Sequence, residues 1–196
     1  MPTLLLGVTG GIAAYKACEL VSLAVKAGHA VRVVMTENAT RFVGPITFEA
    51  LSGSPVLLDT FAGAPLPGST SAIDHISWAK WADVGIVAPL SANTLGKLAC
   101  GLADDALTTV LLAVPTKTPI VLAPAMNTAM WEHPVVRRNL RWLAELGRYA
   151  IVDPASKRLA CGDVGPGALP DPSDLLALVT AATPPPPPVA AGVAGV

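Results

Sequence analysis

The chain divides into short, continuous runs of apolar residues separated by longer segments in which apolar residues recur every three or four positions. The runs cover residues 3–8, 30–35, 84–88, 120–123 and 150–152, and the one at 30–35 is interrupted by Arg32. The segments with helical spacing cover residues 12–27, 46–52, 78–83, 95–114, 134–146 and 171–182. Such apolar runs are typical of parallel strands buried on both faces, and their alternation with helices is typical of α/β proteins. We therefore expect an α/β fold, a single doubly wound (Rossmann-like, flavodoxin-like) parallel sheet with helices on both faces.

Composition indicates one large core followed by a tail. With 196 residues, of which 52% are hydrophobic and 14% charged, the chain fits a single domain that buries much of its surface. We place this domain at residues 1–182. Residues 183–196 are rich in proline and have no means of forming a core, so we expect a disordered tail there.

Charge and hydropathy argue against two classes of partner. The net charge is -1 and there is no basic run of five or more residues, which argues against a nucleic acid. No stretch reaches the roughly 18–20 apolar residues of a membrane span. The N-terminus also lacks a basic region followed by a cleavable hydrophobic segment. We expect a cytoplasmic protein that binds a small molecule and no membrane.

The three cysteines suggest neither a disulfide framework nor a zinc site. Cys18, Cys100 and Cys161 are an odd number, form no CxxC motif and have no histidine pair nearby, so we expect no metal. Cys18 and Cys100 fall in helical patterns and are predicted to be small core residues. Cys161 lies in the glycine-rich residues 153–170, which we expect to form a mobile flap without regular structure, and it is a candidate proton donor.

The apolar run at residues 120–123 leads into a turn that carries one amide side chain. Pro124 cannot donate to a sheet ladder, so the strand ends there and Asn127 follows. Doubly wound proteins hold their ligands at the carboxyl edge of the sheet, which makes Asn127 a candidate ligand contact. Asparagine is also a favoured N-cap, so Asn127 could instead cap the next helix.

The first strand leads into a glycine turn and a helix. Gly10 and Gly11 allow a ligand to approach the backbone, and the helix N-terminus favours an anion such as phosphate, although a plain tight turn has the same pattern. The G-x-G-x-x-G spacing of dinucleotide sites is absent, which disfavours NAD. After the second strand, the Thr36 hydroxyl suits a phosphate or ribityl chain better than Glu37 suits an NAD ribose. His29 is predicted to be a solvated turn residue.

Two further polar segments flank the run at residues 84–88. His75 precedes it, and an imidazole there is the most natural base in the chain near neutral pH, unless it has a capping or structural role. Pro89 and the small polar residues 91–94 follow it, repeating the pattern of strand, proline and turn seen at Asn127. Two strand ends are therefore expected to offer hydroxyls and amides to one ligand.

Taken together, these motifs resemble those of the homo-oligomeric flavin-containing cysteine decarboxylases. The resemblance spans residues 3–182 and rests on five segments in the family's order. These are residues 10–16 (GGIAAYK), 74–76 (DHI), 89–94 (PLSANT), 124–131 (PAMNTAMW) and 160–167 (ACGDVGPG).

The resemblance implies a site, a cofactor and an assembly. It implies His75, Asn127 and Cys161 as catalytic residues. It implies phosphopantothenoylcysteine as substrate, and FMN bound at subunit contacts of a homotrimer or a multiple of three, such as a dodecamer. The FMN residues that it implies are Gly10, Gly11, Ile12, Thr36, Ser91, Asn93, Thr94, Ala125 and Met126.

The chemistry explains why such a family needs a flavin. Loss of CO2 from a cysteine carboxyl leaves a carbanion without an electron sink, unless the thiol carbon is first oxidised to a thioaldehyde. Decarboxylation then gives an enethiolate, which needs hydride and a proton to become an aminoethanethiol. Cys161 would supply that proton, and relatives that act on a C-terminal cysteine of peptides stop at the enethiol. A peptide decarboxylase, a non-catalytic flavin-binding regulatory subunit and an NAD-dependent reductase are the alternatives.

Overall fold

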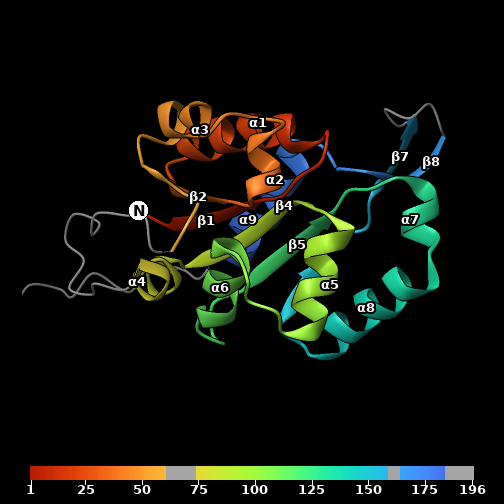
Figure 1. The fold of residues 1–196 in the computed structure, drawn as a ribbon. Coiled ribbons are helices and arrows are strands. Elements are labelled where there is room, and N and C mark those ends of the chain that lie inside the picture. Colours follow the sequence, from red (N-terminus) through yellow and green to blue (C-terminus); the bar gives the residue numbers. More distant parts are fainter. Residues whose placement is uncertain (61–73, 159–163, 184–196) are drawn as a thin grey trace, which may run out of the picture.

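The computed structural model describes residues 1–60, 74–158 and 164–183, and its centre is a parallel sheet of six strands. The strand order is β3-β2-β1-β4-β5-β6 (Figure 1). The strands are β1 Thr3–Val8, β2 Ala30–Met35, β3 Val56–Leu57, β4 Val84–Leu90, β5 Ile120–Pro124 and β6 Tyr149–Ile151. This is the doubly wound Rossmann order, so the expected fold class is confirmed.

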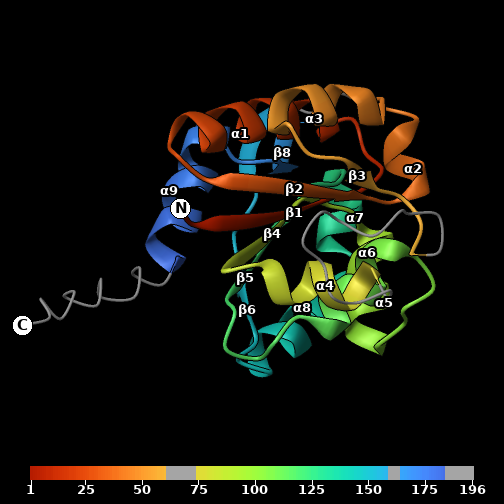
Figure 2. The same ribbon diagram turned by 90° about the vertical axis from the view of Figure 1, so that its left-hand side faces the viewer.

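Helices cover both faces of the sheet (Figure 2). One face is packed by α1 Ala14–Lys26, α3 Pro45–Ser52 and α9 Pro172–Ala182. The other face is packed by α4 Asp74–Trp81, α5 Ala92–Cys100, α6 Ala106–Ala113 and α8 Pro134–Glu145. Two short helices, α2 Glu37–Thr40 and α7 Thr128–Glu132, follow strand ends. No helix in these described parts of the chain is long and apolar enough to cross a membrane.

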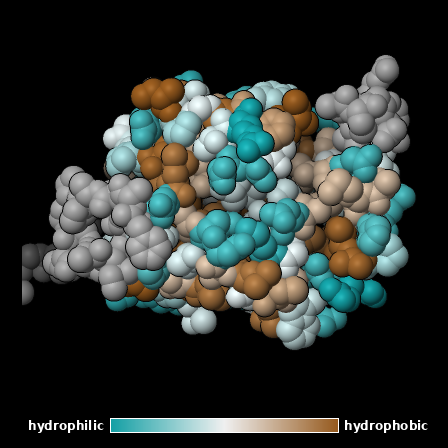
Figure 3. Space-filling model, viewed as in Figure 1, coloured by the Kyte–Doolittle hydropathy of each residue, from teal (hydrophilic) through white to brown (hydrophobic). Residues whose placement is uncertain are grey.

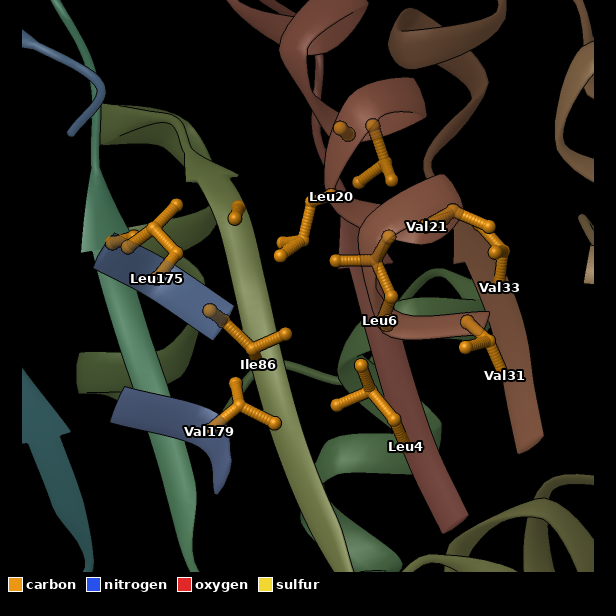
Figure 4. Packing of buried hydrophobic residues seen from close by; sticks show 14 of the residues in the cluster. Leu4, Leu6, Leu20, Val21, Val31, Val33, Ile86, Leu175 and Val179 are labelled. Atoms are coloured by element: carbon orange, nitrogen blue, oxygen red, sulfur yellow. The ribbon is translucent and has the colours of Figure 1, made fainter. Parts of the chain in front are cut away.

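Neighbouring residues along each strand contribute to different cores, because side chains alternate across a sheet. Leu4 and Leu6 pack with α1 and α9, whereas Leu5 between them packs on the opposite face. Figure 4 shows Leu6 and Ile86 beneath Leu20 of α1 and Leu175 of α9. Truncating such a buried leucine to alanine typically costs about 2–5 kcal/mol, so both cores contribute strongly to the stability of the sheet.

The segment 95–114, predicted as one helix, is two helices. Helix α5 ends at Cys100 because Gly101 adopts a left-handed conformation, with φ of 68°. Helix α6 then begins at Ala106, after the N-cap Asp105, whose side chain accepts from the Thr108 N–H in a capping box. Cys100, predicted to be in the core, is instead exposed at this break.

The glycine-rich segment 153–170 was expected to lack regular structure, and this expectation is wrong for its described residues. β7 Ala155–Arg158 and β8 Val164–Ala168 form an antiparallel pair, so β6 is not the last strand. Glycine suits this pair because a Cβ on Gly165 would lie 2.9 Å from Thr128 Oγ1. The Thr128 hydroxyl donates to the Pro166 carbonyl at 3.0 Å, which ties the pair to α7.

Two other sequence-based expectations differ from the structure. His29 was expected to be solvated, but it is 3% exposed, and burial lowers its pKa from the ordinary value. The His29 N–H donates to the Ala24 carbonyl, so the main chain of His29 stays close to the end of α1, and its imidazole is buried. Helix α4 begins at Asp74, earlier than expected, which places His75 in its first turn.

Candidate functional site

The polar turns after β1 and β4 are joined at the point where the strand order reverses. Thr9 Oγ1 donates to the Pro89 carbonyl at 2.7 Å and accepts from the Ser91 N–H at 2.8 Å. Ser91 in turn caps α5, with its Oγ 3.2 Å from the Thr94 N–H. Doubly wound folds bind ligands in the crevice outside such a reversal point, because the neighbouring crossovers leave in opposite directions there.

A cavity of about 760 Å³ opens at this edge of the sheet and is called the first cavity below. Its walls are mainly apolar, with Tyr15, Met130 and Leu169 contributing large side chains. The sequence-predicted residues that it brings together are Gly10, Gly11, Ile12, Ser91, Ala125, Met126 and Asn127. Three strand ends, those of β1, β4 and β5, therefore supply one site, as the motif spacing predicts.

Asn127 is the N-cap of α7 and also lines the first cavity. Its Oδ1 accepts from the Met130 N–H at 3.0 Å, which is the capping hydrogen bond. A neutral amide carries two N–H donors besides that oxygen. The cap fixes the side-chain orientation, which suits a group that must hold a carboxylate in one position.

A second cavity of about 430 Å³ adjoins the first and shares Gly10, Ser91, Ala92 and Met130 with it. It contains the remaining predicted cofactor residues Thr36, Asn93 and Thr94. Thr36 Oγ1 is buried without a hydrogen-bond partner, which is costly unless a ligand supplies one.

Lys97 in the second cavity is held by two carboxylates. Its Nζ lies 2.6 Å from Asp104 Oδ1 and 2.7 Å from Asp105 Oδ2. Hydrogen bonds to Asp104 and then to Asp105 raise the pKa of Lys97. Burial by itself would raise the pKa of Asp105, but hydrogen bonds from Lys97 and Thr108 outweigh burial and lower it. A single ammonium group is therefore shared by two carboxylates in this cavity.

The residues around these cavities fit a phosphate-bearing flavin. A Cβ on Gly11 would meet nothing within 4 Å, so the turn presents bare backbone to open space. Gly10 has no such room, because a Cβ there would lie 2.6 Å from Asn38 Cβ. The bare backbone, the helix α1 N-terminus and the unpartnered Thr36 hydroxyl offer the hydrogen bonds that a phosphate and a ribityl chain require.

The other two predicted catalytic residues are not brought into this site by the described chain. His75 is half-buried in α4 and lines neither cavity. Figure 1 shows α4 at one end of the molecule and α7 and β8 at the other. Cys161 lies outside the described residues. No group of three metal-ligating side chains occurs in the described part of the chain.

The first cavity is also lined by two lysines that the sequence analysis did not single out. Lys16 extends from α1, and Lys157 extends from β7. Lys16 was inside the motif at residues 10–16 and could have been noticed there. Lys157 could not have been identified from the sequence, because its position at the cavity depends on the β7–β8 pair, which the sequence did not predict.

Comparison with known proteins identifies the chain's relatives. A sequence-family model described as Flavoprotein matches residues 1–183. Over 174 residues the chain is 51% identical to the coenzyme A biosynthesis bifunctional protein CoaBC of Bacillus subtilis, covering 89% of this chain and 41% of that protein. Over 168 residues it is 45% identical to the probable phosphopantothenoylcysteine decarboxylase of Streptococcus mutans, covering 86% of this chain and 91% of that protein.

Solved structures agree with the sequence comparison. A mutant PPC decarboxylase complexed with pantothenoylaminoethenethiol superposes with a TM-score of 0.82 at 37% identity, covering 92% of this chain and 97% of that one. The FMN binding protein AtHal3 gives a TM-score of 0.79 at 37% identity, covering 92% and 95%. The chain spans about two fifths of the length of its bifunctional relatives and nearly all of its shorter ones. By its sequence, its fold and the motifs gathered at its site, the chain belongs to the Flavoprotein family.

Proposed function

We propose that the protein catalyses the FMN-dependent decarboxylation of 4′-phosphopantothenoylcysteine to 4′-phosphopantetheine, a step of coenzyme A biosynthesis. The observation that carries this proposal is the meeting of Asn127 with the Gly10 and Ser91 turns in one cavity. In that arrangement an amide that could bind the substrate carboxylate lies beside a turn that suits a flavin. A relative of nearly the same length is named a phosphopantothenoylcysteine decarboxylase, which supports the substrate assignment.

FMN is the cofactor that the site suits. The Gly10–Gly11 turn and Thr36 would hold its phosphate and ribityl chain, with Ser91, Asn93 and Thr94 as further donors, and Ala125 and Met126 would lie at its ring. When bound, FMN supplies a reversible two-electron oxidation of the thiol-bearing carbon, which makes loss of CO2 possible.

The chain's own residues then have distinct tasks. Asn127, fixed by its cap, donates N–H groups to the substrate carboxylate and sets its orientation. His75 acts as the base or hydrogen-bond partner of the substrate thiol, a role usually worth about 10²–10⁴ in rate. Cys161 delivers the proton that completes the saturated product. The apolar walls keep water away from the reacting carbon.

The placement of His75 supports the predicted assembly as well. Since His75 lines neither cavity of its own chain, a neighbouring subunit whose α4 meets the first cavity would complete the site. Ile12 and Tyr15 are each 62% exposed at the cavity rim, and Met130 is 47% exposed, so an apolar surface is available for such a contact. Figure 3 shows several exposed hydrophobic areas interspersed with hydrophilic ones on one face of the molecule. We propose a homotrimer or a multiple of three.

Mass spectrometry of the product tests the proposal. The purified protein, mixed with phosphopantothenoylcysteine, is expected to release CO2 and to give 4′-phosphopantetheine with reoxidised flavin. Cys161→Ser should stop at a product about 2 Da lighter, the enethiol, because a serine hydroxyl is far less acidic than a thiol of pKa about 8.5. Normal saturated product from Cys161→Ser would remove Cys161 from the mechanism. Turnover of a cysteine-ending peptide in place of phosphopantothenoylcysteine would favour the peptide-decarboxylase alternative.

A further inference from the structure

We propose that Lys16 and Lys157 form a subsite for the phosphate monoester of the substrate, at the part of the first cavity between α1 and the β7–β8 pair. This inference rests on the proposed decarboxylase function and adds the residues that would distinguish a phosphorylated substrate from an unphosphorylated one. The two lysines are the charged members among the described residues that line this cavity. The remaining walls offer apolar groups and neutral amides or hydroxyls.

The two ammonium groups converge on one point from separate elements. Lys16 Nζ lies 3.7 Å and Lys157 Nζ lies 2.7 Å from the same atom, Oδ1 of Asp171. Lys16 Nζ also donates to the Leu169 carbonyl at 3.4 Å. Asp171 is the N-cap residue of α9, which packs against the sheet, and the carboxylate of its 55% exposed side chain is shared by both lysines.

The charges around this point do not balance. Two ammonium groups share one carboxylate, which leaves a surplus of one positive charge. The hydrogen bond from Lys157, and with it the charge of both lysines, lowers the pKa of Asp171, so the carboxylate is ionised at neutral pH. A phosphate monoester carries about -1.5 to -2 charges at pH 7 and three acceptor oxygens, so it can take up the surplus.

The lysines also remain accessible to a ligand. The side chain of Lys16 is 19% exposed and that of Lys157 is 45% exposed, and each ammonium group has three N–H donors. Lysine binds phosphate as a mobile point charge, which suits a group at the end of a flexible substrate.

Two other anions could bind to the same lysines, and removing the lysines would have a different effect in each case. If the substrate carboxylate bound there, removing the lysines would impair phosphorylated and unphosphorylated substrates alike. If the phosphate of FMN bound there, removing them would release the flavin. The choice between these anions can therefore be made with the flavin-loaded enzyme and two substrates.

The experiment compares kcat/KM for phosphopantothenoylcysteine and for pantothenoylcysteine, which lacks the phosphate. The variants are Lys16→Gln, Lys157→Gln and the conservative Lys157→Arg, with Lys26→Gln as the matched control at the exposed end of the same helix α1. Each glutamine at positions 16 and 157 should lower kcat/KM for the phosphorylated substrate about 10- to 100-fold, as loss of a hydrogen bond to a charged group does. Pantothenoylcysteine should change less than about twofold, and Lys157→Arg should keep most of the preference, since the charge remains.

Four results would overturn the subsite. Equal losses with both substrates would assign the lysines to the carboxylate or to the order of the β7–β8 pair. Loss of flavin absorbance from the glutamine variants would assign them to the cofactor. Unchanged kinetics, matching those of Lys26→Gln, would leave the lysines without a role in recognition. Wild-type protein that decarboxylates neither compound would instead refute the proposed function, and the subsite with it.

Discussion

The two cavities that meet at Gly10 and Ser91 have opposite ratios of cations to anions. In the first cavity two lysines share one carboxylate, that of Asp171. In the second cavity one lysine, Lys97, is shared by Asp104 and Asp105. The first therefore has positive charge to offer an anionic ligand, whereas the lysine of the second is already neutralised.

This difference shows how one edge of the sheet can bind two ligands, each in a cavity with a different charge. The second cavity is lined by more carboxylates than ammonium groups, Glu37 among them. Its neutral groups, chiefly the unpartnered Thr36 hydroxyl, offer hydrogen bonds that suit the hydroxyl-rich chain of a flavin. The first offers charge and apolar surface, which suit an anionic substrate with an extended apolar body. The turn at Gly10 belongs to both, so a cofactor and a substrate bound there would touch.

The largest expected effect lies in the first cavity, at Asn127. Asn127→Ser retains an N-cap, because serine caps helices nearly as well as asparagine, but it removes the amide N–H groups. We expect kcat/KM for phosphopantothenoylcysteine to fall about 10- to 100-fold, the cost of a lost hydrogen bond to a charged carboxylate. Steady-state kinetics measures this fall, and thermal unfolding should change little.

Asn127→Ala is the matched variant, since it removes the cap together with the amide. It should lose activity to a similar extent and also about 1 kcal/mol of stability. If Asn127→Ser were fully active while Asn127→Ala were impaired, the residue would be a cap alone.

A smaller effect is expected at Thr36 in the second cavity, where a substitution should leave the flavin-free protein as stable or more stable but weaken its binding of FMN. Thr36→Val replaces a buried, unpartnered hydroxyl by a methyl group of similar size. The flavin-free protein should be equally stable or gain up to about 1 kcal/mol, because no buried donor is left unsatisfied. The affinity for FMN should fall about 2- to 10-fold, as expected for one neutral hydrogen bond. Denaturant titration and flavin fluorescence measure the two quantities, and unchanged FMN affinity would exclude Thr36 as a ligand.

The smallest effect concerns the acid stability contributed by Asp105. Because its pKa is lowered in the folded state, its contribution is present above the unfolded pKa of about 3.9 and is lost as pH falls through the folded value. Asp105→Asn keeps an N-cap but removes the ion pair with Lys97, so at pH 7 it should cost up to about 1 kcal/mol. Urea titrations of both proteins should converge below about pH 4. A constant difference between them from pH 7 to pH 3 would contradict the ion-pair explanation.

The sheet and the turns of the site could be predicted because their signals are local. The apolar runs that became β1, β4 and β5 are each contiguous, and the glycine, serine and asparagine turns follow them closely. The reversal of strand order then brings these turns together without further information, as the shared lining of the first cavity confirms.

The break between α5 and α6 was missed although its signals, Gly101 and the Asp105 capping box, are local. The other errors arose where the structure depends on contacts between distant residues. Gly165 reads as a loop residue, yet it lies in β8, at a position where Thr128 leaves no room for a side chain. His29 reads as a turn residue, yet the path of the chain buries it. The ion pairs of Lys157 and Lys97 also depend on tertiary contacts, since their positions relative to Asp171 and Asp105 follow from packing.

The tie between the β7–β8 pair and α7 has a consequence for motion at the site. The Met126 N–H donates to the Gly167 carbonyl at 2.9 Å, and the Thr128 hydroxyl donates to Pro166, so the residues on either side of Asn127 are fastened to β8. If β8 separates from α7, the Met126 amide loses its acceptor and becomes open to exchange with solvent deuterium. The lifetime of that single amide proton therefore measures how often the β7–β8 pair lifts from the site.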